Sequence, residues 1–313
     1  MTHKIIYALL IILLVSGCGK RSENRSDNED QTERSRESHD LKVSILKGFF
    51  YSEDVPKAPT DRLLELKDIL LEDIDKLLQE DLMHCLYLLD YYIDGELLNL
   101  SERESHFLQA YANAKYEQQE TGTMPPDSIL QKEKQYNEIG LDLAHAGEGV
   151  YEIYAGERFY KDFEKYLPEE YREIRSLYFK SRFFFEDASV TVPWQTLGEL
   201  IARYEAYADK NAEMPYTLAS MSSVYNKVQY AYLFGLDNSP LTSERGDGTL
   251  APEIKSEYER FADAYPQSPT TKLIRILLSE SKITVATFEK VQKARQESDY
   301  PLLTADVMMY GEE

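Results

Sequence analysis

YERFADAYPQSPTTKL occupies residues 258–273, and a matching stretch, YEAYADKNAEMP, occupies residues 204–215. The corresponding positions keep a constant offset of 54 (258 − 204 and 269 − 215): they are Tyr204, Glu205, Tyr207, Ala208, Asp209 and Pro215 in the first copy, and Tyr258, Glu259, Phe261, Ala262, Asp263 and Pro269 in the second. Each copy reads as the end of a helix, a turn, and a proline that opens the next helix, where its missing N–H has no intrahelical partner to lose. Such a repeat predicts helical hairpins that stack to bury their apolar faces. The alternative is that two unrelated hairpins share this turn by chance.

Apolar residues recur at intervals of three and four through most of the remaining chain, which is typical of amphipathic helices. One such stripe consists of Leu63, Leu66, Leu70, Ile74, Leu77 and Leu78. Ser101 and Glu104 have the spacing of a capping box and predict a helix start. The other helices are expected at about 80–98, from 127 to about 147–149, and at 150–166, 168–186, 193–210 and 214–235. Strand signals are poor, so we predict an all-α fold of stacked helical hairpins, an α-solenoid that is tetratricopeptide-like.

Residues 254–273 resemble the tetratricopeptide-type repeats of bacterial envelope assembly lipoproteins and of relatives of the cell-division coordinator class. In those repeats a helix rich in Tyr and Phe ends in Tyr-Pro-x-Ser-Pro before the next helix, as Tyr265–Pro269 does here. The period of 54 residues is longer than the roughly 34 of that repeat, so the resemblance is one of shape. It implies a protein-binding scaffold without catalysis.

The amino terminus has the pattern of an export signal. Lys4 precedes an apolar run from Ile5 to Val15, which is shorter than the roughly 20 residues of a spanning helix and lies within the roughly 7–15 of a secretory signal. The following residues, LVSGC at 14–18, resemble the lipobox of bacterial lipoproteins. This resemblance implies that residues 1–17 are a signal peptide cleaved after Gly17, and that Cys18 carries an S-diacylglycerol and an N-acyl chain.

Two other interpretations of this terminus remain open: an ordinary cleaved signal peptide with a chance cysteine, and an uncleaved short anchor. Position 19 is Gly rather than Asp, and in the lipoprotein resemblance this implies the outer membrane if the host has two membranes. The expected location is therefore the bacterial cell envelope, on the periplasmic or the surface side.

The domain organisation follows from composition. Residues 19–40 contain no aliphatic or aromatic side chain, and such a segment buries too little apolar area to offset its ordering entropy. We therefore expect the lipidated cysteine and a disordered tether at 18–41, followed by a helical domain at 42–313. That domain divides into possible sub-domains at 42–148 and 149–313, with a repeat-like region at 197–281.

No residue pattern predicts catalysis, a metal or a cofactor. His84, His106 and His145 fall on separate expected helices and lack the spacing that places two ligands on one helix face. No glycine-rich phosphate loop or Gly-x-Ser-x-Gly elbow occurs. Cys85 lies on an apolar helix face, where a lone cysteine is usually a small core residue. The formal net charge of −21 argues against nucleic acid as a partner.

Aromatic residues are abundant, with 24 Tyr, and tyrosine is enriched at interfaces that are half apolar and half wet. The densest patch spans residues 178–185 and is followed by Trp194. An apolar helix of this kind is usually internal, but part of it can be presented to a partner. Phe183, Phe184 and Trp194 are therefore the candidate interaction surface.

These observations predict a lipid-anchored envelope protein that acts as a non-catalytic protein-binding scaffold, with the membrane and an envelope protein as its partners. One alternative is a lipoprotein that binds or processes glycan or peptide, which needs a concave acidic and aromatic cleft, expected near Trp194 and the loop at 236–250. Another is a periplasmic immunity or inhibitor protein, whose acidic charge would suit a basic target.

Overall fold

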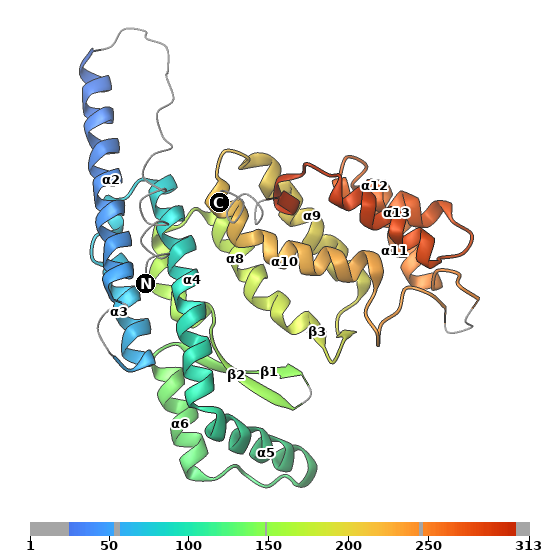
Figure 1. Ribbon diagram of the computed structural model, residues 1–313, viewed down its shortest axis with the longest axis horizontal. Helices are drawn as coiled ribbons and strands as arrows, with labels where there is room; N and C mark the ends of the chain where they lie inside the picture. Colours follow the sequence, from blue (N-terminus) through green and yellow to red (C-terminus); the bar gives the residue numbers. More distant parts are fainter. Residues whose placement is uncertain (1–24, 53–56, 148, 244–246, 305–313) are drawn as a thin grey trace, which may run out of the picture.

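The structure is a computed structural model, and it describes residues 25–52, 57–147, 149–243 and 247–304 (Figure 1). The proposed signal peptide and Cys18 lie outside these residues. Helices dominate the described chain and its strands form only two short hairpins, so the predicted all-α fold is confirmed. Among the described helices, none combines the length and the apolar character that crossing a membrane requires.

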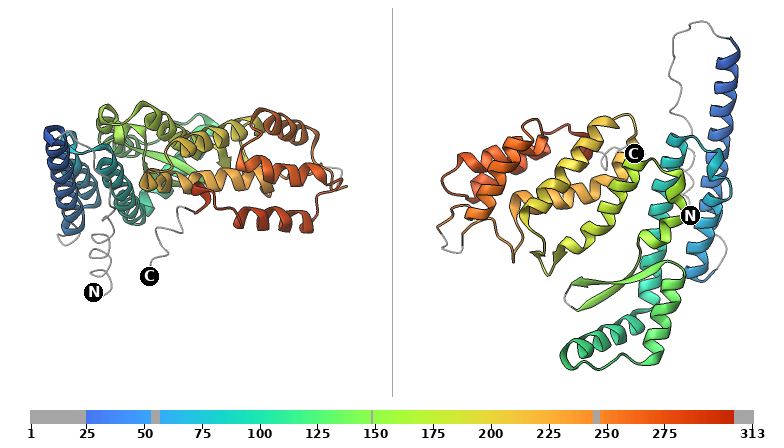
Figure 2. Two further views of the ribbon diagram at one scale, coloured as in Figure 1. Left: turned by 90° about the horizontal axis from the view of Figure 1, so that it is seen from above. Right: turned by 180° about the vertical axis from the view of Figure 1, so that it is seen from behind.

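Three long helices form the first part of the molecule: α2 (Arg25–Ser52), α3 (Pro59–Leu71) and α4 (Gln79–Arg103). They lie side by side in all views (Figures 1 and 2). The predicted stripe explains their packing, because Leu63, Leu66, Leu70 and Ile74 are all buried. Ile74 belongs to a short 3-10 helix, η1 (Ile74–Lys76), rather than to a continued α3.

The prediction of a disordered tether is wrong for residues 25–41, because α2 begins at Arg25. Ser38, on this segment, has 0% exposure; its hydroxyl donates to Asp81 Oδ2 at 2.5 Å and accepts from the backbone N–H of Leu78 at 2.8 Å. Ile45 and Phe49, in the later turns of α2, are buried in the hydrophobic core. Extending an established helix costs much less than nucleating one, so a polar segment can be helical without burying apolar area of its own.

The next region contains α5 (Ser105–Thr121), α6 (Asp127–Glu138) and a β-hairpin of β1 (Leu141–Gly147) and β2 (Val150–Ala155). The predicted capping box is wrong: Ser101 lies inside α4, and its hydroxyl accepts from the backbone N–H of Ile153 at 3.4 Å.

The hairpin lies where two helices were expected. The helix expected from 127 to about 147–149 ends at Glu138, and the first residues of the helix expected at 150–166 form β2. Leu141 pairs with Ala155 and His145 with Tyr151 in antiparallel register. Gly147 has φ +100, a left-handed conformation that glycine adopts without steric cost and that tight turns need. The possible sub-domain boundary between 148 and 149 falls within this hairpin, so β1 and β2 pair across it. Short helical turns follow, α7 (Glu157–Tyr160) and η2 (Lys161–Tyr166).

The second part of the molecule begins with α8 (Glu169–Ser181), which ends earlier than the expected 186. It is followed by the 3-10 turn η3 (Arg182–Phe184) and by two short paired strands, β3 (Phe185–Glu186) and β4 (Ser189–Val190).

The repeat lies in the helices that follow: α9 (Trp194–Lys210), α10 (Pro215–Phe234), α11 (Pro252–Ala264) and α12 (Pro269–Ser279), with α13 (Val285–Gln296) packed on α12. Helices α9 and α10 form one hairpin and α11 and α12 the next; α9 contacts α11, and α10 contacts α12, so the hairpins stack (Figure 2). The matched residues Tyr204 and Tyr258 are both fully buried. The stacked hairpins predicted from the 54-residue offset are therefore present.

Candidate functional site

The three predicted surface aromatics differ in their surroundings. Phe183, in η3, is 56% exposed, and its ring centroid lies 6.3 Å from that of Tyr154 on β2. Phe184 is half-buried against the core. Trp194 is also half-buried, at the start of α9, with its ring centroid 6.1 Å from that of Tyr232. Phe183 is therefore the most accessible of the three.

The three histidines singled out in the sequence have different surroundings in the structure. His84 is buried and its ring stacks on that of Tyr216, with centroids 3.6 Å apart. His145 Nδ1 lies 3.1 Å from a carboxylate oxygen of Glu186, and His106 is exposed on α5. Over the described parts of the chain, no three His, Cys, Asp or Glu side chains come together in a group that could hold a metal.

A pocket of about 200 Å³ lies where α4, α8 and α10 meet; we name it the α4–α8 pocket. Tyrosines and charged side chains of α4 and α8 form most of its wall, and residues of α10 complete the lining. Its lining residues are Tyr87, Asp90, Tyr91, Asp94, Tyr171, Ile174, Arg175, Tyr178, Ala219, Ser220, Met221 and Ser223. Figure 1 shows the three helices that carry these residues: α4 belongs to the first part of the molecule, and α8 and α10 to the second.

Helical spacing places these side chains together. Tyr87, Tyr91, Asp94 and Leu98 are separated by four, three and four residues and so share one face of α4. Tyr91 is 61% exposed, and Leu98 is exposed to a similar degree. This face therefore presents two large side chains to solvent: Tyr91, which lines the pocket, and Leu98, which lies one helical turn beyond Asp94.

Asp90 is held by strong contacts. The two terminal nitrogens of Arg175 donate to its two carboxylate oxygens at 3.0 and 2.7 Å, a bidentate geometry that adds strength and geometric specificity to an arginine–carboxylate pair. The guanidinium carbon of Arg175 lies 4.2 Å from the ring centroid of Tyr160, and only 10% of the Arg175 side chain is exposed. Asp90 and Arg175 therefore form a rigid, largely buried connection between α4 and α8.

Asp94 follows one helical turn after Asp90 but has no arginine of the described chain paired with it. Within the described residues it makes no hydrogen bond and no ion pair, although it lines the pocket, where it is exposed to solvent. Desolvation by the surrounding protein, and then repulsion by Asp90, raise the pKa of its carboxyl to about 6; Arg182 and Arg175 oppose this shift. Among the described residues, no cationic side chain is therefore paired with Asp94.

The aromatic surface continues beyond the pocket. Arg182 lies near enough to the pocket for its charge to act on Asp94. Its guanidinium carbon lies 4.6 Å from the ring centroid of Tyr154, and Arg182 forms an ion pair with Glu152. Because Tyr154 also contacts Phe183, the predicted surface residue Phe183 adjoins this region through Tyr154. We call Tyr91, Leu98, Tyr154 and Phe183 the adjoining aromatic and apolar residues of the pocket.

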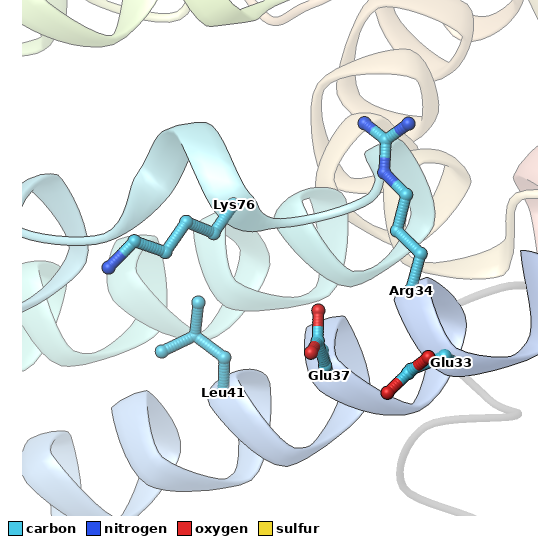
Figure 3. A pocket seen from close by; sticks show the side chains of 5 residues that line it. All are labelled: Glu33, Arg34, Glu37, Leu41 and Lys76. Carbon is cyan, nitrogen blue, oxygen red and sulfur yellow. The ribbon is translucent and has the colours of Figure 1, made fainter. Parts of the chain in front are cut away.

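A second hollow has a larger volume, about 680 Å³, but it is lined mainly by exposed charged side chains. Figure 3 shows Glu33, Arg34, Glu37 and Leu41 of α2 on one side and Lys76 of η1 on the other. The charged side chains that form it are all exposed, and Lys76 is already paired with Asp73. Exposed charges on flexible stems hold a ligand weakly, so this notch is a poor candidate site. Neither hollow includes Trp194 or a residue of the loop at 236–250.

No pattern in the sequence by itself identifies the α4–α8 pocket. The spacing of Tyr87, Tyr91 and Leu98 with Asp94 was an available signal, but carboxylates are so frequent in this chain that none stands out. Arg175, which holds Asp90, lies 85 residues away in the sequence, and no local pattern links the two. No protein-family model, curated protein or solved structure matches this chain.

Proposed function

We propose that this protein is a lipid-anchored component of the bacterial envelope that binds another protein through the α4–α8 pocket and its adjoining residues, without catalysis. The observation that carries the proposal is the open face of α4, which presents Tyr91 and Leu98 beside a polar pocket. Large aromatic side chains next to a pocket are the usual anchors of protein interfaces.

The dimensions of the site favour a protein partner. Sites that enclose whole small molecules usually have volumes of about 300–1,000 Å³, and the α4–α8 pocket has about 200 Å³. A pocket of this size suits one side chain of a larger partner, whose remaining surface would cover Tyr154 and Phe183. The stacked hairpins supply a rigid support for such a surface.

The anchor is proposed from the LVSGC stretch at 14–18. A lipid attachment needs more than one acyl chain to be stable, and a triacylated Cys18 would meet that requirement. In a host with two membranes, Gly19 favours the outer membrane. The net charge of −21 favours a protein partner over nucleic acid.

One observation favours a second candidate, a lipoprotein that processes glycan or peptide. The pocket contains two carboxyl groups, and a carboxyl with a pKa of about 6, like that of Asp94, suits a general acid. Against this, both oxygens of Asp90 are engaged by Arg175. Release of soluble fragments from isolated cell-wall polymer by the wild type, abolished in Asp94→Asn, would replace the scaffold proposal.

Site-specific photocrosslinking in living cells tests the scaffold proposal. A photoreactive phenylalanine analogue at position 91 is expected to give a discrete crosslinked band of one size, because Tyr91 stands at the pocket mouth. The matched control is the same analogue at Tyr116, which is similarly exposed but lies on α5, a helix that contributes no residue to the pocket. Crosslinks that are absent, or equal at both positions, would contradict the proposed surface.

The anchor has its own test. The intact mass of the wild type is expected to correspond to a chain that begins at Cys18 and carries acyl groups, and the protein is expected to fractionate with membranes. Cys18→Ser is expected to abolish both results. A wild-type chain that is unprocessed or carries no lipid would remove the anchor from the proposal and leave the binding surface to be judged separately.

A further inference from the structure

We infer that the α4–α8 pocket receives the cationic side chain, lysine or arginine, of a basic segment of the partner protein, with Asp94 as its counter-ion and the pocket tyrosines as its walls. The inference rests on the proposed protein-binding function and specifies the chemistry of the partner. Four features support it: the state of Asp94, the size of the pocket, its aromatic walls, and the charge of the whole chain.

Asp94 is the acidic group at the pocket that lacks a cation of its own. Arg175 is committed to Asp90 through two hydrogen bonds, and Arg182 is committed to Glu152. Within the described residues, Asp94 makes no ion pair or hydrogen bond although it lines the pocket. A guanidinium or ammonium group from outside would form a charge-assisted hydrogen bond with it. It would also relieve the repulsion between Asp94 and Asp90.

The size of the pocket suits one long side chain. A volume of about 200 Å³ corresponds to roughly six or seven water molecules at their share of liquid volume. Lysine and arginine reach such a pocket through a slender aliphatic stem, which can lie along apolar surface while the charged head meets its counter-ion. Ile174 and Met221 provide apolar surface in the pocket wall.

The walls are of the kind that attracts cations. Tyr87, Tyr91 and Tyr178 line the pocket together with Asp94, and an aromatic face attracts a cation within about 6 Å of its centroid. The protein already makes such contacts near the pocket: the guanidinium carbon of Arg175 lies 4.2 Å from the Tyr160 ring centroid, and that of Arg182 lies 4.6 Å from the Tyr154 ring centroid. A partner cation would be held in the same way.

The surroundings favour a polypeptide over a free amine. Leu98, Tyr154 and Phe183 lie beyond the pocket, and a small amine that fills the pocket would leave them uncovered. A polypeptide that inserts one basic side chain could cover them with its neighbouring residues. The net charge of −21 would attract a basic segment over a distance and speed its association.

Peptide binding tests the inference on the full-length protein in detergent micelles. The probe is a fluorescein-labelled tetra-arginine peptide flanked by glycines, and the comparison is the same peptide with citrulline, which keeps the shape of arginine without its charge. The arginine peptide is expected to bind at least tenfold more tightly than the citrulline peptide. Asp94→Asn is expected to weaken arginine-peptide binding by about tenfold or more.

Glu173→Gln is the matched control, because it removes one negative charge from an exposed position of α8 that does not line the pocket. It is expected to change the affinity by less than twofold. Equal weakening by both variants would show that only the overall charge of the protein attracts the peptide. Equal affinity for the citrulline peptide would show that the cation is not recognised. Either result would overturn the inference.

Thermal unfolding of Asp94→Asn checks that this variant is folded. Tyr91→Ala changes another residue of the pocket wall and is also expected to weaken arginine-peptide binding.

This test and the crosslinking test can fail independently. A specific crosslink at position 91 with no preference for arginine over citrulline would leave the proposed protein-binding function standing and overturn the cationic inference. Selective arginine-peptide binding that depends on Asp94, without any crosslinked protein in cells, would support the pocket chemistry and contradict the proposed cellular role.

Discussion

His84 joins the two parts of the molecule through one stacked contact. Its ring, on α4, lies against that of Tyr216, on α10, and only 4% of the residue is exposed. Desolvation, followed by the positive charge of Lys42, lowers the pKa of the imidazole to about 4. The unfolded imidazole titrates near 6.5, so between these values the unfolded chain binds the proton and the folded chain does not.

We therefore expect the free energy of unfolding to decrease as pH falls from about 6.5 to about 4, because the unfolded chain takes up a proton at His84 that the folded chain does not. The part of this decrease due to His84 is on the order of 3 kcal/mol. His84→Phe retains a ring that can stack on Tyr216 but has no titrating group, so its stability is expected to fall less over this range. Urea unfolding at pH 7 and pH 4.5 measures the difference. The exposed His106 is the control, and His106→Phe is expected to keep the wild-type pH dependence. An unchanged dependence in His84→Phe would contradict the assignment.

At the scale of elements, Gly198 allows α9 and α11 to approach closely. A Cβ atom at this position would lie 2.5 Å from a carboxylate oxygen of Glu257, 3.0 Å from the Tyr232 hydroxyl and 3.1 Å from the ring of Phe261. The Tyr232 hydroxyl donates to Glu257 at 3.0 Å. The contact that stacks one hairpin of the repeat on the next therefore leaves no room for a methyl group.

Gly198→Ala is expected to lower the free energy of unfolding by about 1–3 kcal/mol, because an extra methyl group in a packed region forces its neighbours to move. Gly95→Ala, in α4, is the matched substitution: no atom lies within 4 Å of its added Cβ, and alanine has the higher helix propensity, so stability is expected to rise by up to about 1 kcal/mol. Chemical denaturation of both variants provides the measurement. A neutral or stabilising Gly198→Ala would mean that the hairpins are not stacked this tightly.

Across the whole molecule, the buried apolar side chains form one continuous cluster from Ile45 to Leu302. The ion pair of Asp90 and Arg175 crosses between α4 and α8 within this assembly. Removing one partner of a largely buried pair leaves an uncompensated charge, which costs more than the pair itself contributes.

Arg175→Met is expected to lower the free energy of unfolding by about 3 kcal/mol, and the double variant with Asp90→Leu is expected to recover part of that loss. The comparison pair is Arg203 and Glu173, which also joins two helices, α8 and α9, but is exposed on both sides; Arg203→Met is expected to cost less than about 1 kcal/mol. Thermal and urea unfolding of these variants, together with the single variant Asp90→Leu, completes the double-mutant cycle. If the double variant were no more stable than Arg175→Met, the explanation by an unpaired Asp90 would be wrong.

The amino-acid sequence by itself determined the helical class, most helix starts after residue 160 and the stacked repeat. Pro215, Pro252 and Pro269 are the first residues of α10, α11 and α12, and proline restricts its own backbone locally whatever surrounds it. Tyr204 and Tyr258 became buried as the 54-residue offset predicted, because apolar periodicity is also a local property.

Only the tertiary structure decided the helical state of residues 25–41, the β1–β2 hairpin and the α4–α8 pocket. Ser38 is buried through contacts with residues about 40 positions away, and Asp90 is held by Arg175 from 85 positions away. Asp94 differs from the many other carboxylates of the chain because the nearby arginines, Arg175 and Arg182, are paired with Asp90 and Glu152 instead. Contacts between residues far apart in sequence carry no local periodicity, so packing, rather than pattern, places these groups together.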